Sequence, residues 1–86
     1  MPRISEFFGI AIYMYYKDHM PPHFHAIYAE YDAAVGIDSI QVLEGRLSRR
    51  AESLVYEWAA RYQAELRANW ELARASQPLQ QIPPLD

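Results

Sequence analysis

Apolar and polar residues alternate along the first half of the chain, which is the pattern of strands with one buried face. Residues 3–16, RISEFFGIAIYMYY, predict two strands that turn around Phe8-Gly9, because glycine readily adopts the positive φ of a tight turn. Residues 23–38, HFHAIYAEYDAAVGID, predict a second hairpin that turns near Ala29-Glu30. Neither Ala nor Glu favours the left-handed backbone of such a turn, so the second hairpin depends on its pairing pattern.

The pairing pattern assigns residues to the two faces of the sheet. A two-residue turn at Ala29-Glu30 pairs apolar residues on one face: Tyr28 with Tyr31, Ala26 with Ala33, and Phe24 with Val35. A matching register in the first hairpin adds four core residues: Ile10, Ile12, Met14 and Tyr16. The outer face then carries Tyr13, Tyr15, Lys17, His23 and His25, and we expect Tyr15 to neighbour His25.

The second half of the chain has the period of an amphipathic helix. In residues 48–75, SRRAESLVYEWAARYQAELRANWELARA, apolar residues recur at steps of three and four. Ser48 is the expected N-cap, and Trp58 is expected in the core. A straight helix of this length would span about 40 Å at about 1.5 Å per residue, which is long for a small sheet. We therefore expect a kink or break between Tyr62 and Ala64.

These patterns predict an α+β fold: an antiparallel sheet of about four strands, in two hairpins, packed against a long or broken C-terminal helix. The 86 residues predict a single domain, with a β-rich part (1–43), a helical part (48–75) and an extended, proline-containing tail (76–86). We expect the tail either to pack back on the domain or to bind a partner, through Leu79, Ile82 and Leu85.

Composition narrows the chemistry. The chain has no cysteine, so a metal would need histidine and carboxylate ligands. The net charge of −3 argues against broad electrostatic binding to nucleic acid, although a local basic cluster can still contact phosphates. The N-terminal residues show neither a signal peptide nor a transmembrane run, which favours a cytoplasmic protein that does not enter the membrane.

The three histidines of the chain all fall in KDHMPPHFHA, residues 17–26. His23 and His25 alternate on a predicted strand and project from one face, as a pair of metal ligands requires, with His19 as a third ligand. A carboxylate ligand would come from Asp18, Asp32 or Asp38. Beside Tyr15 and Lys17, the same pair suits metal-free acid/base work, for which small Ala34 and Gly36 would leave open space. Spacing alone also permits the alternative that His23 and His25 are ordinary surface residues of a strand. No cofactor is expected.

A second candidate site is EGRLSRR, residues 44–50. Arg46, Arg49 and Arg50 gather at the predicted helix N-terminus, where backbone N–H groups already favour anions. This arrangement predicts a phosphate or carboxylate partner. The alternative is that these arginines are solvated and paired with Glu52 or Asp38.

Three segments, FFGIAIYMYYKDHMPPHFHAIYAEYDAAVGID, LEGRLSRRA and EWAARYQAELRANWELA, resemble domain-of-unknown-function family 4160 (DUF4160), a family of small prokaryotic proteins. The resemblance covers nearly the whole chain. It implies a family motif at His19, Pro21, Pro22, His23, Phe24 and His25, and a second signature at 45–50. The chain departs from the expected pattern at Ala29, where glycine is expected.

The resemblance implies a biological setting and leaves the mechanism open. Members of the family are uncharacterised, and they are often encoded beside a member of DUF2442, as in a toxin–antitoxin module. The chain is then expected to be one component of such a module that binds a small partner protein of the DUF2442 type. If it is the toxin, the expected target is RNA, and an enzyme would be ribonuclease-like and metal-independent. His23, His25 and Tyr15 would be catalytic, and the binding residues would be Arg46, Arg49, Arg50, His19 and Lys17. The alternatives are a non-enzymatic interaction module and a metal-binding regulator that uses His19, His23 and His25.

Overall fold

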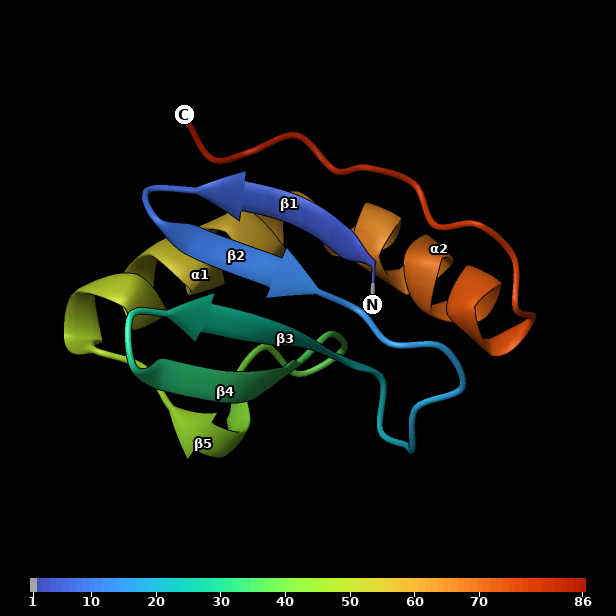
Figure 1. Ribbon diagram of the computed structural model, residues 1–86, viewed down its shortest axis with the longest axis horizontal. Coiled ribbons are helices and arrows are strands. Elements are labelled where there is room, and N and C mark those ends of the chain that lie inside the picture. Colours follow the sequence, from blue (N-terminus) through green and yellow to red (C-terminus); the bar gives the residue numbers. More distant parts are fainter. Residues whose placement is uncertain (1) are drawn as a thin grey trace.

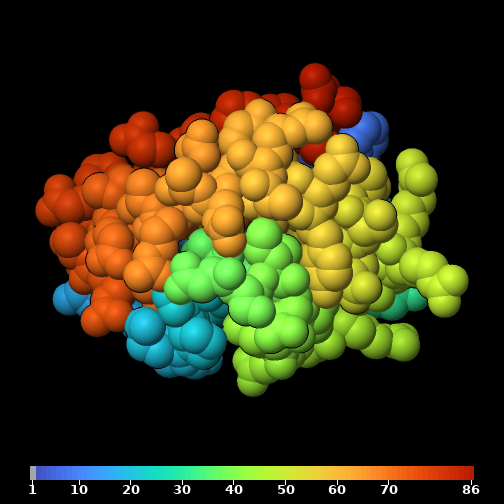
Figure 2. All heavy atoms as spheres, turned by 180° about the vertical axis from the view of Figure 1, so that it is seen from behind, coloured from blue at the N-terminus to red at the C-terminus, as the bar shows by residue number. Residues whose placement is uncertain are grey.

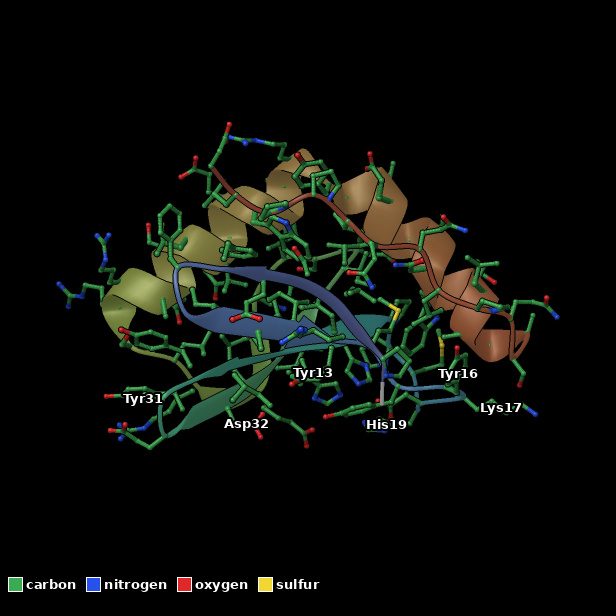
Figure 3. The ribbon with its side chains drawn as sticks, turned by 45° about the horizontal axis from the view of Figure 1, so that its top comes forward. Tyr13, Tyr16, Lys17, His19, Tyr31 and Asp32 are labelled. Atoms are coloured by element: carbon green, nitrogen blue, oxygen red, sulfur yellow. The ribbon has the colours of Figure 1, made fainter. Side chains whose placement is uncertain are left out.

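The computed structural model describes residues 2–86 as two layers, a sheet and a pair of helices (Figure 1). The strands β1 (Arg3–Phe7), β2 (Ile10–Tyr13), β3 (His23–Tyr28), β4 (Tyr31–Gly36) and β5 (Val42–Arg46) form one antiparallel sheet in that order. The helices α1 (Arg49–Arg61) and α2 (Gln63–Arg74) lie on the same face of the sheet (Figures 1 and 3). The α+β class is confirmed, but the sheet has five strands in place of about four, and the helical part, predicted as one long or broken helix, forms two helices. Among the described residues, no helix is long and apolar enough to cross a membrane.

The second hairpin has the predicted register. Phe24 pairs with Val35, Ala26 with Ala33, and Tyr28 with Tyr31. Ala29 lies in the turn at a φ of 53°, in the left-handed region that an alanine disfavours by about 1–2 kcal/mol. The hairpin forms there because a shift of one residue would turn its buried face toward solvent.

The strand that the sequence pattern missed is β5. Four of its five residues are exposed and do not alternate, because it is the outermost strand and its ladder with β4 is interrupted by a bulge. Gly45 sits in this strand at a φ of 74°, and a Cβ there would clash with the backbone of Asp32. The approach of β5 to β4 therefore requires glycine at this position, a constraint that hydrophobic periodicity cannot express.

The helical half breaks at Tyr62, inside the predicted interval. Ser48 caps α1 as expected, since its hydroxyl accepts a hydrogen bond from the Ala51 N–H. Tyr62 has φ −115° and ψ 29°, outside the helical region, and separates the two helices. The break lets two short helices cover one sheet in a molecule whose longest extent is 33 Å.

The core lies between the sheet and the helices. Ile10, Ile12 and Met14 are fully buried as predicted, and so are both tryptophans. Tyr16 was expected in this row, but it is 44% exposed, so that prediction is wrong. The physical reason is that β2 ends at Tyr13, so the chain has left the sheet before it reaches Tyr16, and the positive φ at Lys17 turns it further away.

The C-terminal tail packs against β1 and the helices rather than extending into solvent. Ile82 and Leu85 are buried, and Leu79 packs against the core. The Ile82 N–H donates to the Ile4 carbonyl, which covers the outer edge of β1. Asn69, fully buried in α2, donates to the Gln80 carbonyl at 2.8 Å and accepts from the Gln80 N–H at 2.9 Å. The Asn69 side chain thus makes the pair of backbone hydrogen bonds with the tail that a neighbouring β-strand would make.

Replacing Asn69 with alanine is expected to release the tail, because both Gln80 backbone groups lose their partner. The free energy of unfolding should fall by about 1–3 kcal/mol, the usual cost of unpaired buried polar groups. Hydrogen exchange at the Gln80 and Ile82 amides should accelerate, while exchange in β3 follows only the global loss. Gln81→Ala is a matched control, since Gln81 makes one exposed bond to the Arg3 carbonyl. Unchanged hydrogen exchange at the Gln80 amide in Asn69→Ala would show that Asn69 does not hold the tail.

Candidate metal and acid–base site

The loop between β2 and β3 carries the candidate site, and backbone hydrogen bonds hold it at both ends. The Lys17 N–H donates to the Ala73 carbonyl at the end of α2, and the Ile37 N–H donates to the Pro22 carbonyl. Figure 2 shows this loop in cyan, against the end of α2 and beside the segment that follows β4. The loop is therefore fixed by two elements that are distant in the sequence.

Asp18 lies among all three histidines of the chain. Its Oδ2 atom is 3.0 Å from the Nε2 of His23 and 3.2 Å from the Nε2 of His25. Its Oδ1 atom accepts the backbone N–H of His19 at 2.8 Å and lies 2.9 Å from the Nδ1 of that residue. One carboxylate is thus the common neighbour of the whole histidine cluster.

His23 is the buried member of the cluster, with a side chain that is only 2% exposed. Its ring lies 5.3 Å from the ring of Trp70 in α2, so a plain surface role for His23 is wrong. The sequence pattern assigned His23 to the outer face, but it could not show that the ring would be buried against Trp70 and bonded to Pro21 and Asp18 of the loop before β3.

The proton arrangement of His23 follows from its partners. Its Nδ1 lies 2.7 Å from the Pro21 carbonyl, which can only accept, so Nδ1 carries a hydrogen. In a neutral ring, Nε2 then presents a lone pair to Asp18 Oδ2, which is also an acceptor. Two acceptors at 3.0 Å need either a shared proton or a metal ion between them.

Asp18, His23 and His25 also bring three potential metal-ligand atoms close together. One ligand atom of each lies within 4.8 Å of the others. Bonds of about 2.0–2.1 Å to a tetrahedral zinc ion place neighbouring donors about 3.3 Å apart, close to the two N–O distances here. The bond from His23 to the Pro21 carbonyl is the outer contact that metal-bound imidazoles usually make. His19 was the expected third ligand, but the third member of this group is Asp18, and the side chain of His19 is 72% exposed.

Tyr15 stacks on His25, as predicted, with ring centroids 4.4 Å apart. Burial raises the pKa of the Tyr15 phenol, and the negative charge of Asp32 raises it further. Tyr15 therefore keeps its proton at neutral pH and can donate a hydrogen bond. Tyr15 is therefore suited to position His25 or to donate a proton, and it is not suited to act as a phenolate.

Shallow hollows open around the cluster. One of about 490 Å³ is bordered by Tyr15 and His25 on one side and by Asp32 and Glu44 on the other, with Ala34 between them. Ala34 leaves open space, as predicted. Gly36 does not, because a Cβ there would meet the Ser39 carbonyl at 2.5 Å.

The three predicted arginines do not join the histidines. Arg49 and Arg50 line a separate hollow with Ser53 and Leu54, at the start of α1. Arg46 lies over the ring of Tyr31, at 5.3 Å, and Figure 3 shows Tyr31 at the far end of the sheet from His19. Among residues 2–86, none of the three forms an ion pair, and Asp38 pairs with Arg67 instead. The expected pairing with Glu52 or Asp38 is therefore absent.

Two residues of the site were given too little weight by the sequence analysis. Asp18 was one of three carboxylates considered, and its position beside His19 did not show that it would reach both other rings. Arg74 was not considered, because as the last residue of an amphipathic helix it reads as a solvated cation. It reaches the loop and lies 3.0 Å from the Met20 sulfur.

The Asp18 carboxyl should make folding sensitive to acid. Burial raises its pKa, but hydrogen bonds from His25 and the His19 backbone, with the charge of His23, outweigh burial and hold the pKa below its usual range. A lowered pKa contributes stability that is fully present above the unfolded value of about 3.9 and lost as the pH falls through the folded value. In metal-free protein, the free energy of unfolding should therefore fall below about pH 4 more steeply than in Asp18→Asn. Parallel urea titrations from pH 6 downward measure the difference, and identical slopes would contradict it.

The fold and the site define a class: a small two-layer α+β domain with a carboxylate and two histidines joined at one sheet corner. Residues 9–71 match the family described as Domain of unknown function (DUF4160), and the chain belongs to that family. No curated protein and no solved structure matches the sequence. The match includes the whole of the Asp18, His23 and His25 cluster.

Proposed function

We propose that this domain binds a divalent transition-metal ion, with zinc as the first candidate, through Asp18 Oδ2, His23 Nε2 and His25 Nε2. The observation that carries the proposal is the pair of contacts of His23, with Nδ1 2.7 Å from the Pro21 carbonyl and Nε2 3.0 Å from a carboxylate oxygen of Asp18. Three protein ligands leave at least one coordination position for water or substrate, which is the composition of catalytic zinc sites. The function supported best is therefore metal-assisted hydrolytic chemistry.

Elemental analysis of protein purified without a polyhistidine tag tests this proposal. The expected result is about one equivalent of zinc, nickel or cobalt after dialysis, lost on treatment with a strong chelator and regained on adding the ion. Cobalt(II) loading should give visible bands typical of low-symmetry coordination by nitrogen and oxygen. Metal-free protein with a dissociation constant for zinc weaker than about 100 µM, near −5.5 kcal/mol, would overturn the proposal.

A second candidate function is metal-free acid–base catalysis on RNA, favoured by the stacked pair of Tyr15 and His25. In this scheme Asp18 orients His25, and His25 exchanges a proton with a ribose hydroxyl or a leaving group. RNA cleavage that persists in excess chelator and disappears in His25→Ala would favour this scheme over the metal-dependent one. Cleavage that requires added metal would favour the first proposal.

We also propose, from the family membership, that the protein is one component of a two-gene module. The outer face of the sheet supports a small partner protein of the DUF2442 type, because it carries half-buried Tyr13 and Tyr15 with no helix over it (Figure 3). A cytoplasmic location and toxin activity on RNA belong to the same proposal. Induced expression in a bacterial host should arrest growth for the natural protein and not for His25→Ala. Partner binding retained by His25→Ala would separate the catalytic role from the interaction role.

A further inference from the structure

A hollow of about 340 Å³ lies beside the Asp18 carboxylate, and two cations border it. Lys17 comes from the loop that carries the histidines, and Arg74 comes from the last turn of α2. Asp18, His19 and Met20 complete the lining. Cations from two distant segments thus meet next to Asp18, one of the three proposed metal ligands.

The backbone holds both cations in place. The Lys17 N–H donates to the Ala73 carbonyl, so the two segments are joined one residue before Arg74. Lys17 has a φ of 54°, a conformation that most side chains avoid and that turns the loop sharply at this point. The Arg74 Nη1 lies 3.0 Å from the Met20 sulfur, which places the guanidinium against the loop.

Neither cation has a carboxylate partner in the part of the chain that the structure describes. By contrast, Arg3, Arg61 and Arg67 each form an ion pair with a glutamate or an aspartate. Asp18 is the nearest acid in sequence to Lys17, but both of its oxygens face histidine nitrogens. Lys17 and the Arg74 donors other than Nη1, which contacts the Met20 sulfur, therefore stay available to a ligand.

The charges in this corner select an anion. A divalent ion on two neutral imidazoles and one carboxylate leaves a net charge of about +1, and Lys17 and Arg74 add two more positive charges. The hollow on the other side of His25 is bordered by Asp32 and Glu44, which repel anions. An anionic group is therefore directed to the Lys17 side of the metal ligands.

A phosphate group fits this arrangement better than a carboxylate. Its tetrahedral set of oxygens can contact a metal ion, an ammonium and a guanidinium at once, whereas a carboxylate has two oxygens for the three partners. We propose that Lys17 and Arg74 form the phosphate-binding subsite of the metal centre, and that the substrate is a phosphate ester. This inference rests on the proposed function, since the metal ion supplies the third contact.

Titration of zinc-loaded protein with inorganic phosphate tests the subsite by calorimetry, and cobalt-loaded protein reports the same event in its visible spectrum. The Lys17→Gln/Arg74→Gln double variant should retain its metal and bind phosphate at least about 10-fold more weakly, since each lost charged hydrogen bond costs about 1.5–3 kcal/mol. Arg3→Gln/Arg61→Gln removes the same charge from two arginines that pair with acids and do not line this hollow, and it should bind phosphate as the natural protein does. Acetate in place of phosphate should bind more weakly to the natural protein.

The outcomes separate the two proposals. Protein that retains no metal refutes the metal site, and the subsite built on it fails as well. Protein that holds its metal but binds phosphate equally in the natural and Lys17→Gln/Arg74→Gln forms refutes the subsite alone. Equal loss of phosphate affinity in both double variants would show a general effect of net charge and would also refute the subsite. Acetate binding as tight as phosphate would refute the phosphate ester as substrate class.

Discussion

Trp58→Ala is expected to bring the domain close to unfolding at room temperature. Trp58 is fully buried and its ring contacts Phe7, Phe24 and Tyr62 at centroid distances of 5.2, 5.6 and 6.2 Å. Its indole N–H also donates to the Pro83 carbonyl at 2.8 Å. Truncation thus removes a core aromatic ring and a bond that holds the tail. Such changes cost about 3–5 kcal/mol out of a total of roughly 5–15 kcal/mol for a whole domain.

Urea denaturation followed by circular dichroism measures this loss. Trp58→Phe retains most of the ring contacts and loses the bond to Pro83, so its cost should be smaller, about 1–2 kcal/mol. Phe8→Ala is the matched exposed control, since Phe8 is 56% exposed, and it should change stability by less than about 0.5 kcal/mol. A loss below about 1 kcal/mol for Trp58→Ala would be inconsistent with a core centred on this ring.

Trp58 also shows why much of the fold is predictable from the sequence. A tryptophan at helical spacing among alanine, leucine and valine has one low-energy placement, against the sheet. The second hairpin is fixed in the same way, because its period-two pattern allows only one register with a buried face. Local periodicity was therefore sufficient wherever an element buries one face and exposes the other.

Elements without such a face were the ones missed. β5 is exposed along nearly its whole length and owes its place to the bulge and to Gly45. Tyr16 continues the alternation of β2 in the sequence, yet the chain turns away from the sheet around Lys17. The residue types do not predict a lysine with a positive φ. Both features depend on neighbours that are distant in the sequence.

The candidate site was likewise only partly predictable from the sequence. His23 and His25 share a face because strand geometry requires it, and Tyr15 follows from the register of the hairpins. The choice of Asp18 over Asp32 and Asp38 depends on how the Lys17–Pro22 loop folds over the sheet, and that path is set by bonds to Ala73 and Ile37. The arginines lie away from the histidines because β5 ends beside the β3–β4 turn, where Arg46 pairs with Asp32, whereas His23 begins β3 at the other end of the sheet.

Removal of either His25 or Asp18 is expected to abolish metal binding at micromolar metal concentrations. Loss of an outer-shell partner costs about 10–100-fold in metal affinity, and loss of a direct ligand should cost more than about 100-fold. His25→Ala and Asp18→Asn are the informative changes, because both side chains are partly exposed and their loss leaves the core intact. His23 is too deeply buried for its alanine variant to separate ligation from folding.

His19→Ala provides the matched control for these two ligand variants. It removes the same type of side chain from the same loop, next to Asp18, but His19 lies outside the three-donor group and is mostly exposed. Competition with a chromophoric chelator should give an affinity within about threefold of the natural protein, a difference below about 0.7 kcal/mol. Equal damage by His19→Ala and His25→Ala would mean that all three histidines bind the ion, as the residue spacing first suggested. Undiminished affinity in His25→Ala would place the ion elsewhere and leave Asp18, His23 and His25 as a proton-sharing cluster.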